Sequence, residues 1–416
     1  MVPNDWEEHT LKSLCSKVID NRGKTPPLSS NGIPLIEINA IVKGMHPDLS
    51  KVTKFVSKDT FNSWFRNGHT TRGDILVATV GNAGVNGIVN RPEGFGAIAQ
   101  NLVGIRCHQT IDSSFLYYSM NTQSYFSKVK SVLMGAVQPS LKVPHLLSFS
   151  FLVPPLPEQR KIAKILSTWD KAISTTEKLI ETSKQQKKAL MQQLLTGKKR
   201  LVNPETGKVF EGEWEEVKLS YFFDRVTEKN KGQSTNVVTI SAQHGLIRQE
   251  EFFKKSVASE TLDNYFILRK GQFAYNKSYS NGYPMGAIKR LNRYEDAVVT
   301  SLYICFELKN EQMASSCFME QYFESGLLNR GLTKVAAEGG RAHGLLNVKP
   351  ADFMALAIIA PQLNEQQKIA SVLTAADKEI EVLETKLAHL KQEKKALMQQ
   401  LLTGKRRVKV DEEVAA

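Results

Sequence analysis

The stretch KKALMQQLLTGK occupies residues 187–198, and the same twelve residues return at 394–405, 207 positions later. Other short segments recur at an offset of 207 or 208: Glu158-Gln159 as Glu365-Gln366, and Trp6-Glu7-Glu8 as Trp214-Glu215-Glu216. The 416-residue chain therefore repeats itself with a period of half its length. A duplicated chain presents two similar surfaces, which suits a ligand that is made of two parts.

Each copy of the repeated stretch ends a segment with the pattern of a long helix. Apolar residues recur at alternating steps of four and three, the spacing of a coiled-coil seam, with polar breaks such as Lys187 and Lys394. Gly197 and Gly404 are placed to end the helices. A helix over 158–197 would reach about 60 Å at 1.5 Å per residue. We interpret the seam as core that sets a distance; a zipper between two subunits is the alternative use.

The rest of the chain predicts two compact α+β domains. Short β-rich runs such as 74–80 and 297–300 are broken by Gly, Asn and Pro, and helical patterns follow near 114–127 and 315–326. Residues 202–207 form a turn-rich linker. The expected fold class is α+β with an internal pseudo-two-fold repeat, in this order: domain 1–153, long helix 154–200, domain 201–360, long helix 361–407, tail 408–416.

The charge of the chain suggests a polyanionic partner. The net charge is +13 and the isoelectric point is near 9.4. The excess is uneven, because residues 155–200 hold 11 basic and 4 acidic side chains while 201–360 hold 19 of each. Charge alone would not make the second domain a nucleic-acid binder.

The composition also indicates the cellular compartment. The start, MVPNDWEEHT, has no apolar core segment, so we expect no signal peptide, and no apolar run is long enough to span a bilayer. The four cysteines form no CxxC pair and suit buried thiols in a reducing cytosol, without a zinc site or disulfide framework: Cys15, Cys107, Cys305 and Cys317. We therefore predict a cytoplasmic protein with no membrane partner and no metal.

Sequence signatures of catalysis are missing. There is no GxxxxGK[ST] phosphate loop, no GxGxxG after a strand and no HExxH. The Asn/Asp-Pro-Pro-aromatic run of amino-methylating DNA methyltransferases is also absent. These absences favour a binding protein over an enzyme, and we name no catalytic residue and no cofactor in this chain.

Polar, glycine-bearing loops recur at matching places in both halves. Residues 79–87 correspond to 274–283, and 134–142 correspond to 338–347. Asn and Gln on such loops can pair with adenine, Arg and Lys with guanine, and Gly lets the backbone approach phosphate. Each loop taken singly is an ordinary turn. The candidate DNA contacts are Arg72, Asn82, Asn86, Gln138, Ser140, Lys142, Tyr275, Asn276, Lys277, Tyr279, Asn281, Arg341, His343 and Asn347.

These features together resemble the specificity subunit of type I restriction–modification enzymes, over essentially the whole chain. The resemblance rests on the order domain, helix, domain, helix. It rests also on Pro-Leu-Pro-Glu-Gln-Arg-Lys-Ile-Ala at 155–163 and on the duplicated Lys-Lys-Ala-Leu-Met-Gln-Gln-Leu-Leu-Thr-Gly. Arg72-Gly73-Asp74-Ile75-Leu76 before a glycine loop is similar to the family's target recognition domains. The second domain departs from it with Arg269-Lys270-Gly271-Gln272-Phe273, which fits two different half-sequences.

The resemblance implies a function without catalysis in this chain. Each domain would read one half of a split double-stranded DNA target, and the helices would pair antiparallel, set the gap and dock the modification subunits. Those subunits would carry S-adenosylmethionine and methylate adenine. Restriction subunits would add ATP- and Mg-dependent translocation and cleavage.

Two other functions stay open from the residues. The first is a DNA methyltransferase or nuclease with its own recognition domains, which predicts a catalytic motif. The second is a coiled-coil protein-interaction scaffold with two binding heads, which the balanced charge of residues 201–360 favours.

Overall fold

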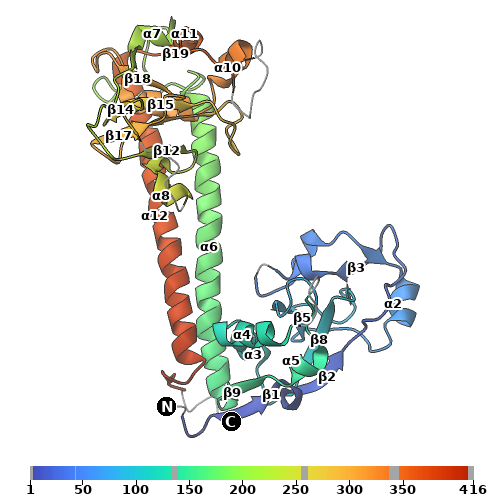
Figure 1. Ribbon diagram of the computed structural model, residues 1–416. Helices are drawn as coiled ribbons and strands as arrows, with labels where there is room; N and C mark the ends of the chain where they lie inside the picture. Colours follow the sequence, from blue (N-terminus) through green and yellow to red (C-terminus); the bar gives the residue numbers. More distant parts are fainter. Residues whose placement is uncertain (1–2, 43, 134–138, 254–260, 337–345, 411–416) are drawn as a thin grey trace. The chain divides into compact units, whose positions relative to one another are not determined.

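The computed structural model describes residues 3–42, 44–133, 139–253, 261–336 and 346–410 (Figure 1). The chain divides into two compact units, and each consists of one globular domain with parts of both long helices. Unit 1 comprises residues 1–177 and 385–416, and unit 2 comprises residues 178–384. The domain boundaries expected from the sequence place each long helix in a segment of its own, whereas these units divide both helices.

The domain of unit 1 is built on a four-stranded antiparallel sheet. Its centre is β5 (Ile75–Ala78), a run of four buried apolar residues, as expected from the β-rich pattern of 74–80. The order of the sheet is β2 (Cys15–Ile19), β8 (Leu102–Cys107), β5 and β6 (Asn86–Ile88). A smaller sheet has the order β4 (Phe55–Val56), β3 (Ile33–Ile36) and β7 (Ala97–Ile98), and β1 (Glu7–Thr10) pairs with β9 (Ser150–Val153).

Short helices cover this sheet. The helical pattern near 114–127 forms two helices, α3 (Ser113–Ser119) and α4 (Gln123–Val132), because Thr122 caps the second one through its hydroxyl. The remaining elements are α1 (Leu11–Leu14), η1 (Ile38–Ala40), η2 (Leu49–Lys51), α2 (Lys58–Trp64) and α5 (Val143–Leu147).

The domain of unit 2 repeats the central sheet of unit 1. Its order is β11 (Phe223–Val226), β18 (Ile304–Leu308), β15 (Phe273–Asn276) and β16 (Ala287–Arg290), again antiparallel. β10 (Glu215–Lys218) pairs with β19 (Ala357–Ala360) as β1 pairs with β9. The helices are α7 (Leu219–Phe222), α8 (Gln249–Phe253), α9 (Ser316–Glu324), α10 (Asn329–Ala336) and α11 (Pro350–Met354).

The two domains differ in their small sheets. Unit 2 has two two-stranded antiparallel sheets: β12 (Val238–Ser241) with β13 (Gly245–Arg248), and β14 (Phe266–Arg269) with β17 (Asp296–Val299). Unit 1 has the three-stranded sheet β4–β3–β7 instead. The conserved part of the repeat is therefore the central sheet, and the small sheets have diverged.

The long helices are α6 (Leu156–Leu194) and α12 (Leu363–Leu401), each of 39 residues. Within each unit their parts pack antiparallel, because residue numbers rise along one helix as those of its ion-pair partners fall along the other (Figure 1). The pairs are Asp170–Lys394 and Glu177–Lys391 in unit 1, and Lys187–Asp377 and Lys184–Glu384 in unit 2. This confirms the antiparallel pairing within both units.

The ends of the apolar seam are core, as expected, whereas middle residues such as Leu383, Leu387 and Leu390 are half-buried. Ile162, Leu166 and Leu401 join the hydrophobic cluster of the first domain. Met191, Leu194 and Leu373 join that of the second domain. Each domain therefore shares one continuous core with its own part of the helix pair, since the same cluster contains residues of the sheet and of both helices.

Gly197 and Gly404 follow the two helices in the left-handed backbone region, with φ of +69° and +71°. Only glycine adopts this conformation without strain, which confirms the predicted helix ends. A Cβ atom at Gly404 would also collide with the ring of Pro3, so the end of the second helix lies against the start of the chain in unit 1.

The cysteines differ from the expectation in one respect. All four are free, but only Cys305 is buried: Cys15 and Cys107, which are register partners across β2 and β8, are half-buried, and Cys317 is exposed. Burial raises the pKa of Cys305 to about 12. Within the described residues no helix is both long and apolar enough to cross a membrane.

Candidate nucleic-acid interface

The two polar segments predicted in the first domain lie side by side. The backbone N–H of Leu141 donates to the carbonyl of Thr79 at 2.7 Å, and Val80 and Ser140 form an antiparallel bridge. The β5–β6 loop turns back at Gly84, whose φ is +87° and whose backbone packs against Val129 of α4. Residues about 60 positions apart in the sequence thus lie next to each other at the loop after β5.

The same pairing occurs in the second domain. The backbone N–H of Leu346 donates to the carbonyl of Lys277 at 3.1 Å, so the β15–β16 loop lies beside the segment that leads into α11. Asn276 accepts from the N–H of Ser278, and Ser280 pairs with Tyr283 to form the tip of the loop. The sequence predicted matching loops in both halves, and in each half the described end of the second segment lies beside the first loop.

Of the eleven candidates that the structure describes, six are exposed. In unit 1, Arg72, Asn82 and Lys142 are exposed and Ser140 is partly exposed. In unit 2, Tyr279, Asn281 and Asn347 are exposed, with Tyr279 at 66 % exposure, while Asn276 and Lys277 are half-buried. Exposed amide, amine and phenol groups on adjacent loops can reach the base edges of a DNA groove.

Two candidates are corrected by the structure. Asn86 is buried, and its amide donates to the carbonyls of Gly84 and Met120 and accepts from Asn121. Its hydrogen-bonding groups are used inside the domain, so it supports the loop and does not read DNA.

Tyr275 is the second correction. It is fully buried, stacks on Phe353 with ring centroids 4.9 Å apart and donates its hydroxyl to the carbonyl of Met285. Burial raises the pKa of its phenol. Tyr283, in the same β15–β16 segment, is half-buried and donates to Glu324.

Three candidates lie outside the described residues: Gln138, Arg341 and His343. Their role stays a prediction from the sequence. They belong to the segments that continue directly into Ser140 and Asn347.

The Glu-Gln pairs at the start of both helices have a structural role that the sequence analysis missed. Glu158 accepts hydrogen bonds from Arg407, and Glu365 accepts them from Arg200. Within each unit, an arginine shortly after the end of one helix therefore binds the start of the other. Arg407 also binds Asp5 and holds the pKa of that carboxyl below its usual range. The signal was present, since both partners recur at the same offset of 207.

The glutamine of each pair joins the helix to its own domain. The side chain of Gln159 accepts from the N–H of Asp112, the N-cap of α3, and donates to the carbonyl of Pro154. Gln366 does the same with Ser315, the N-cap of α9, and Pro361. The repeated motif thus positions equivalent short helices in the two units.

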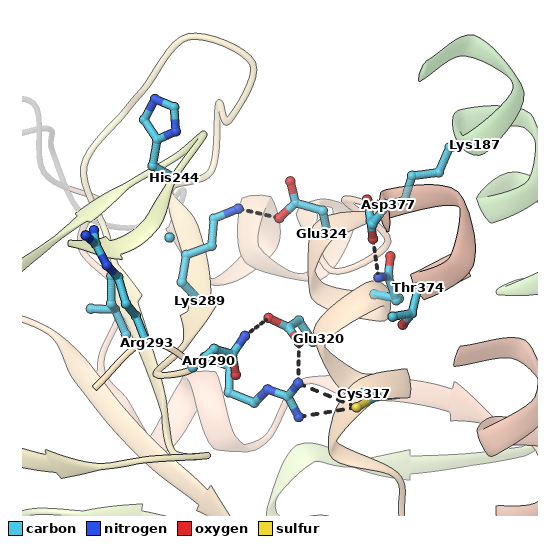
Figure 2. A pocket seen from close by; sticks show the side chains of 14 residues that line it. Lys187, His244, Lys289, Arg290, Arg293, Cys317, Glu320, Glu324, Thr374 and Asp377 are labelled. Atoms are coloured by element: carbon cyan, nitrogen blue, oxygen red, sulfur yellow. Dashed lines mark hydrogen bonds and ion pairs between the residues drawn. The ribbon is translucent and has the colours of Figure 1, made fainter. Parts of the chain in front are cut away.

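A hollow of about 460 Å³ in unit 2 lies between α9, the strands β13 and β16, and the helix pair (Figure 2). Its cationic wall residues already have carboxylate partners, in the pairs Lys187–Asp377, Lys289–Glu324, Arg290–Glu320 and Arg293–Glu251. The hollow therefore offers an anionic ligand no unpaired Lys or Arg charge, and the candidate interface stays with the loops.

Two copies of one sheet domain, each with paired polar loops of different sequence and each joined to an antiparallel helix pair, define a two-headed recognition protein. The family model described as "Type I restriction modification DNA specificity domain" matches the chain twice, over residues 3–184 and 211–392. The chain belongs to this family of type I restriction–modification specificity subunits.

Relatives and solved structures agree with this assignment. The chain is 26% identical over 440 residues to the type I restriction enzyme MjaVIII specificity subunit of Methanocaldococcus jannaschii, which covers 98% of this chain and 94% of that protein. It is 25% identical over 432 residues to the putative MjaX specificity subunit of the same organism, covering 98% and 95%.

The crystal structures show the same fold. The S subunit of a type I system from M. genitalium superposes with a TM-score of 0.57 at 15% identity, covering 97% of this chain and 98% of that one. The HsdS subunit from Thermoanaerobacter tengcongensis gives a TM-score of 0.51 at 15% identity with the same coverage.

Proposed function

We propose that each globular domain of this chain reads one half of a split double-stranded DNA target, and that the helices set the gap between the half-sites and dock the modification subunits. One observation carries the proposal. In both units the loop after the equivalent strand, β5 or β15, is hydrogen-bonded to the described end of the second polar segment, through Leu141–Thr79 and Leu346–Lys277, and the exposed side chains differ. Equivalent position with different chemistry is what two unlike half-sites require.

The physical properties of the chain support this reading. Amide and amine groups of Asn82 and Lys142 in one unit, and of Asn281 and Asn347 in the other, suit direct contacts to bases in a major groove. The basic excess of residues 155–200 adds attraction to phosphate that is independent of sequence. Two half-sites read from one face of B-DNA have centres about 34 Å apart or a multiple of it.

Methylation and cleavage belong, in this proposal, to partner subunits. S-adenosylmethionine would sit in the modification subunits, and ATP with Mg would act in the restriction subunits. The complex would act on cellular DNA in the cytoplasm. A rival, a methyltransferase or nuclease with its own recognition domains, predicts that the purified chain alone binds S-adenosylmethionine; isothermal titration with that compound separates the two.

The test is a map of methylated adenines in cells that express the chain together with its modification subunits. We expect a split motif that disappears when the chain is omitted. The variant Tyr279→Ala with Asn281→Ala should then relax one half of the motif, because its exposed loop groups are lost. Asn82→Ala with Lys142→Ala is the matched variant in unit 1 and should relax the other half.

Two results would overturn the proposal. A methylation map that does not depend on the chain would remove its role in recognition, and would favour the protein-interaction scaffold. A split motif whose two halves change together in both variants would show that the loops are not separate readers.

A further inference from the structure

Each long helix has a lysine within its apolar seam and an aspartate beside the seam, at the same spacing. α6 carries Asp170 and Lys187, and α12 carries Asp377 and Lys394, each pair 17 residues apart. Because the helices run antiparallel within both units, the aspartate of one faces the lysine of the other. Lys394 Nζ lies 2.6 Å from Asp170 in unit 1. Lys187 Nζ lies 2.6 Å from Asp377 in unit 2.

These ion pairs are largely shielded from water on the lysine side. The lysine side chains are 19 % and 13 % exposed, whereas Lys184 in the neighbouring pair with Glu384 is 51 % exposed. A half-buried charge within an apolar seam is stabilised only while its partner stays opposite to it. A single polar position in such a seam therefore specifies the register of the helices.

Each aspartate also binds the globular domain of its unit. The hydroxyl of Tyr118, on α3, donates to Asp170 at 2.7 Å. The side-chain amide of Gln321, on α9, donates to Asp377 at 2.7 Å. Figure 2 shows Lys187 of α6 reaching toward Asp377 of α12 at this junction. Tyr118 and Gln321 are both buried, and burial together with the Asp170 carboxylate raises the pKa of the Tyr118 phenol, which keeps it a donor.

Residues at or just beyond the ends of these short helices contact the β5–β6 and β15–β16 loops. Three residues after Tyr118, Asn121 donates to Asn86, whose amide binds the loop carbonyl of Gly84. Three residues after Gln321, Glu324 accepts from the β15–β16 loop residue Tyr283 and from Lys289. In each unit, the seam is therefore connected to the β5–β6 or β15–β16 loop through hydrogen bonds and one turn of backbone. The residues that make this connection differ between the two units.

We propose that the two seam junctions, Asp170–Lys394–Tyr118 and Asp377–Lys187–Gln321, are positioning elements that fix the gap at which the two half-sites are read. The proposal rests on the function proposed above. The length of the helices sets the approximate gap. Within each unit, the junction fixes the register of the two helices and the position of the loop relative to them, and this excludes neighbouring gaps.

The experiment uses the full chain co-expressed with its modification subunits and measures methylation as a function of gap length. Lys187→Met removes the charge and keeps the apolar stem. We expect methylation at sites with gaps one base pair shorter or longer to rise about tenfold relative to the main gap, with both half-sequences unchanged. Lys184→Met, which breaks only the exposed pair, should leave the gap profile as it is.

A charge exchange tests whether pairing itself is responsible. The double variant Lys187→Asp with Asp377→Lys should restore the single gap, because the side-chain oxygen of Gln321 has no hydrogen-bond partner and can accept from a lysine at 377. Tyr118→Phe, which removes one hydroxyl in unit 1, provides a mild second variant and should broaden the gap profile in the same direction.

The outcomes separate the two proposals. An unchanged gap profile in Lys187→Met and Tyr118→Phe, or an equal loss of methylation at all gaps, would overturn the positioning role while the split motif of the parent protein stands. A parent protein that produces no split motif would overturn the proposed function, and the positioning role with it.

Discussion

The amide of Asn86 makes three hydrogen bonds inside the first domain, whereas the side chain of Asn82 in the same loop is exposed. Asn86→Ala should therefore lower the free energy of unfolding by about 1–3 kcal/mol, because buried carbonyls lose their donor. Asn82→Ala should change it by no more than about 0.5 kcal/mol. Urea unfolding followed by circular dichroism measures both, and equal effects would contradict the assignment of one residue to support and the other to reading.

The residues of the candidate interface could be predicted from sequence only as a group. Glycine spacing and polar composition placed the β5–β6 and β15–β16 loops correctly, because turns depend on local backbone preferences. Whether a given side chain points inward depends on residues far away in the chain. Asn86 is hydrogen-bonded to Met120 and Asn121, and Tyr275 stacks on Phe353. The local sequence pattern does not predict these neighbours.

At the scale of the elements, the ends of the long helices are held by an arginine–glutamate contact in each unit. Arg200 binds both carboxylate oxygens of Glu365, whose side chain is 2 % exposed, at 2.6 and 2.7 Å. Arg200→Met leaves that carboxylate buried without its partner, so we expect a loss of about 3 kcal/mol in the free energy of unfolding of unit 2.

The duplicated contact in unit 1 supplies the comparison. Arg407→Met should lower the free energy of unfolding by less than Arg200→Met does. Arg407 is 44 % exposed, and the indole N–H of Trp6 still donates to Glu158 at 3.2 Å. Arg406→Met, one residue away and exposed, serves as the control. Hydrogen exchange by mass spectrometry localises each effect to its unit. A loss at Arg407 that equals or exceeds the loss at Arg200 would contradict this account.

The elements themselves were more predictable than their contacts. A seam repeated over 39 residues is a strong periodic signal, and both helices were expected with their glycine ends. The short strands were found where buried apolar runs were dense, as in β5 and β17. Others, such as β4 and β7, were not, because strands of two residues carry little periodicity. The lysines in the seam were read as breaks, since their aspartate partners become visible only when the antiparallel register is known.

At the scale of the whole molecule, the internal repeat makes the helix pair a candidate ruler. Each helix of 39 residues extends about 58 Å at 1.5 Å per residue. Removing residues 174–180 from α6 together with 385–391 from α12 deletes one heptad from each helix. It takes out both members of the Glu177–Lys391 pair and leaves the two seam junctions in place. The seam pattern is preserved because seven residues are one full repeat.

The paired deletion shortens the helix pair by about 10.5 Å, which corresponds to roughly three base pairs of DNA. We expect the preferred gap in the methylation map to shorten by about that number, with both half-sequences retained. The efficiency should fall, because three base pairs also turn the DNA through roughly 100°. Deleting the heptad from α6 alone should abolish methylation. The seam residues of α6 beyond the deletion would then face the wrong residues of α12. Methylation that persists at the original gap after the paired deletion would show that the helices do not measure the distance, and the spacing would have to come from the domains.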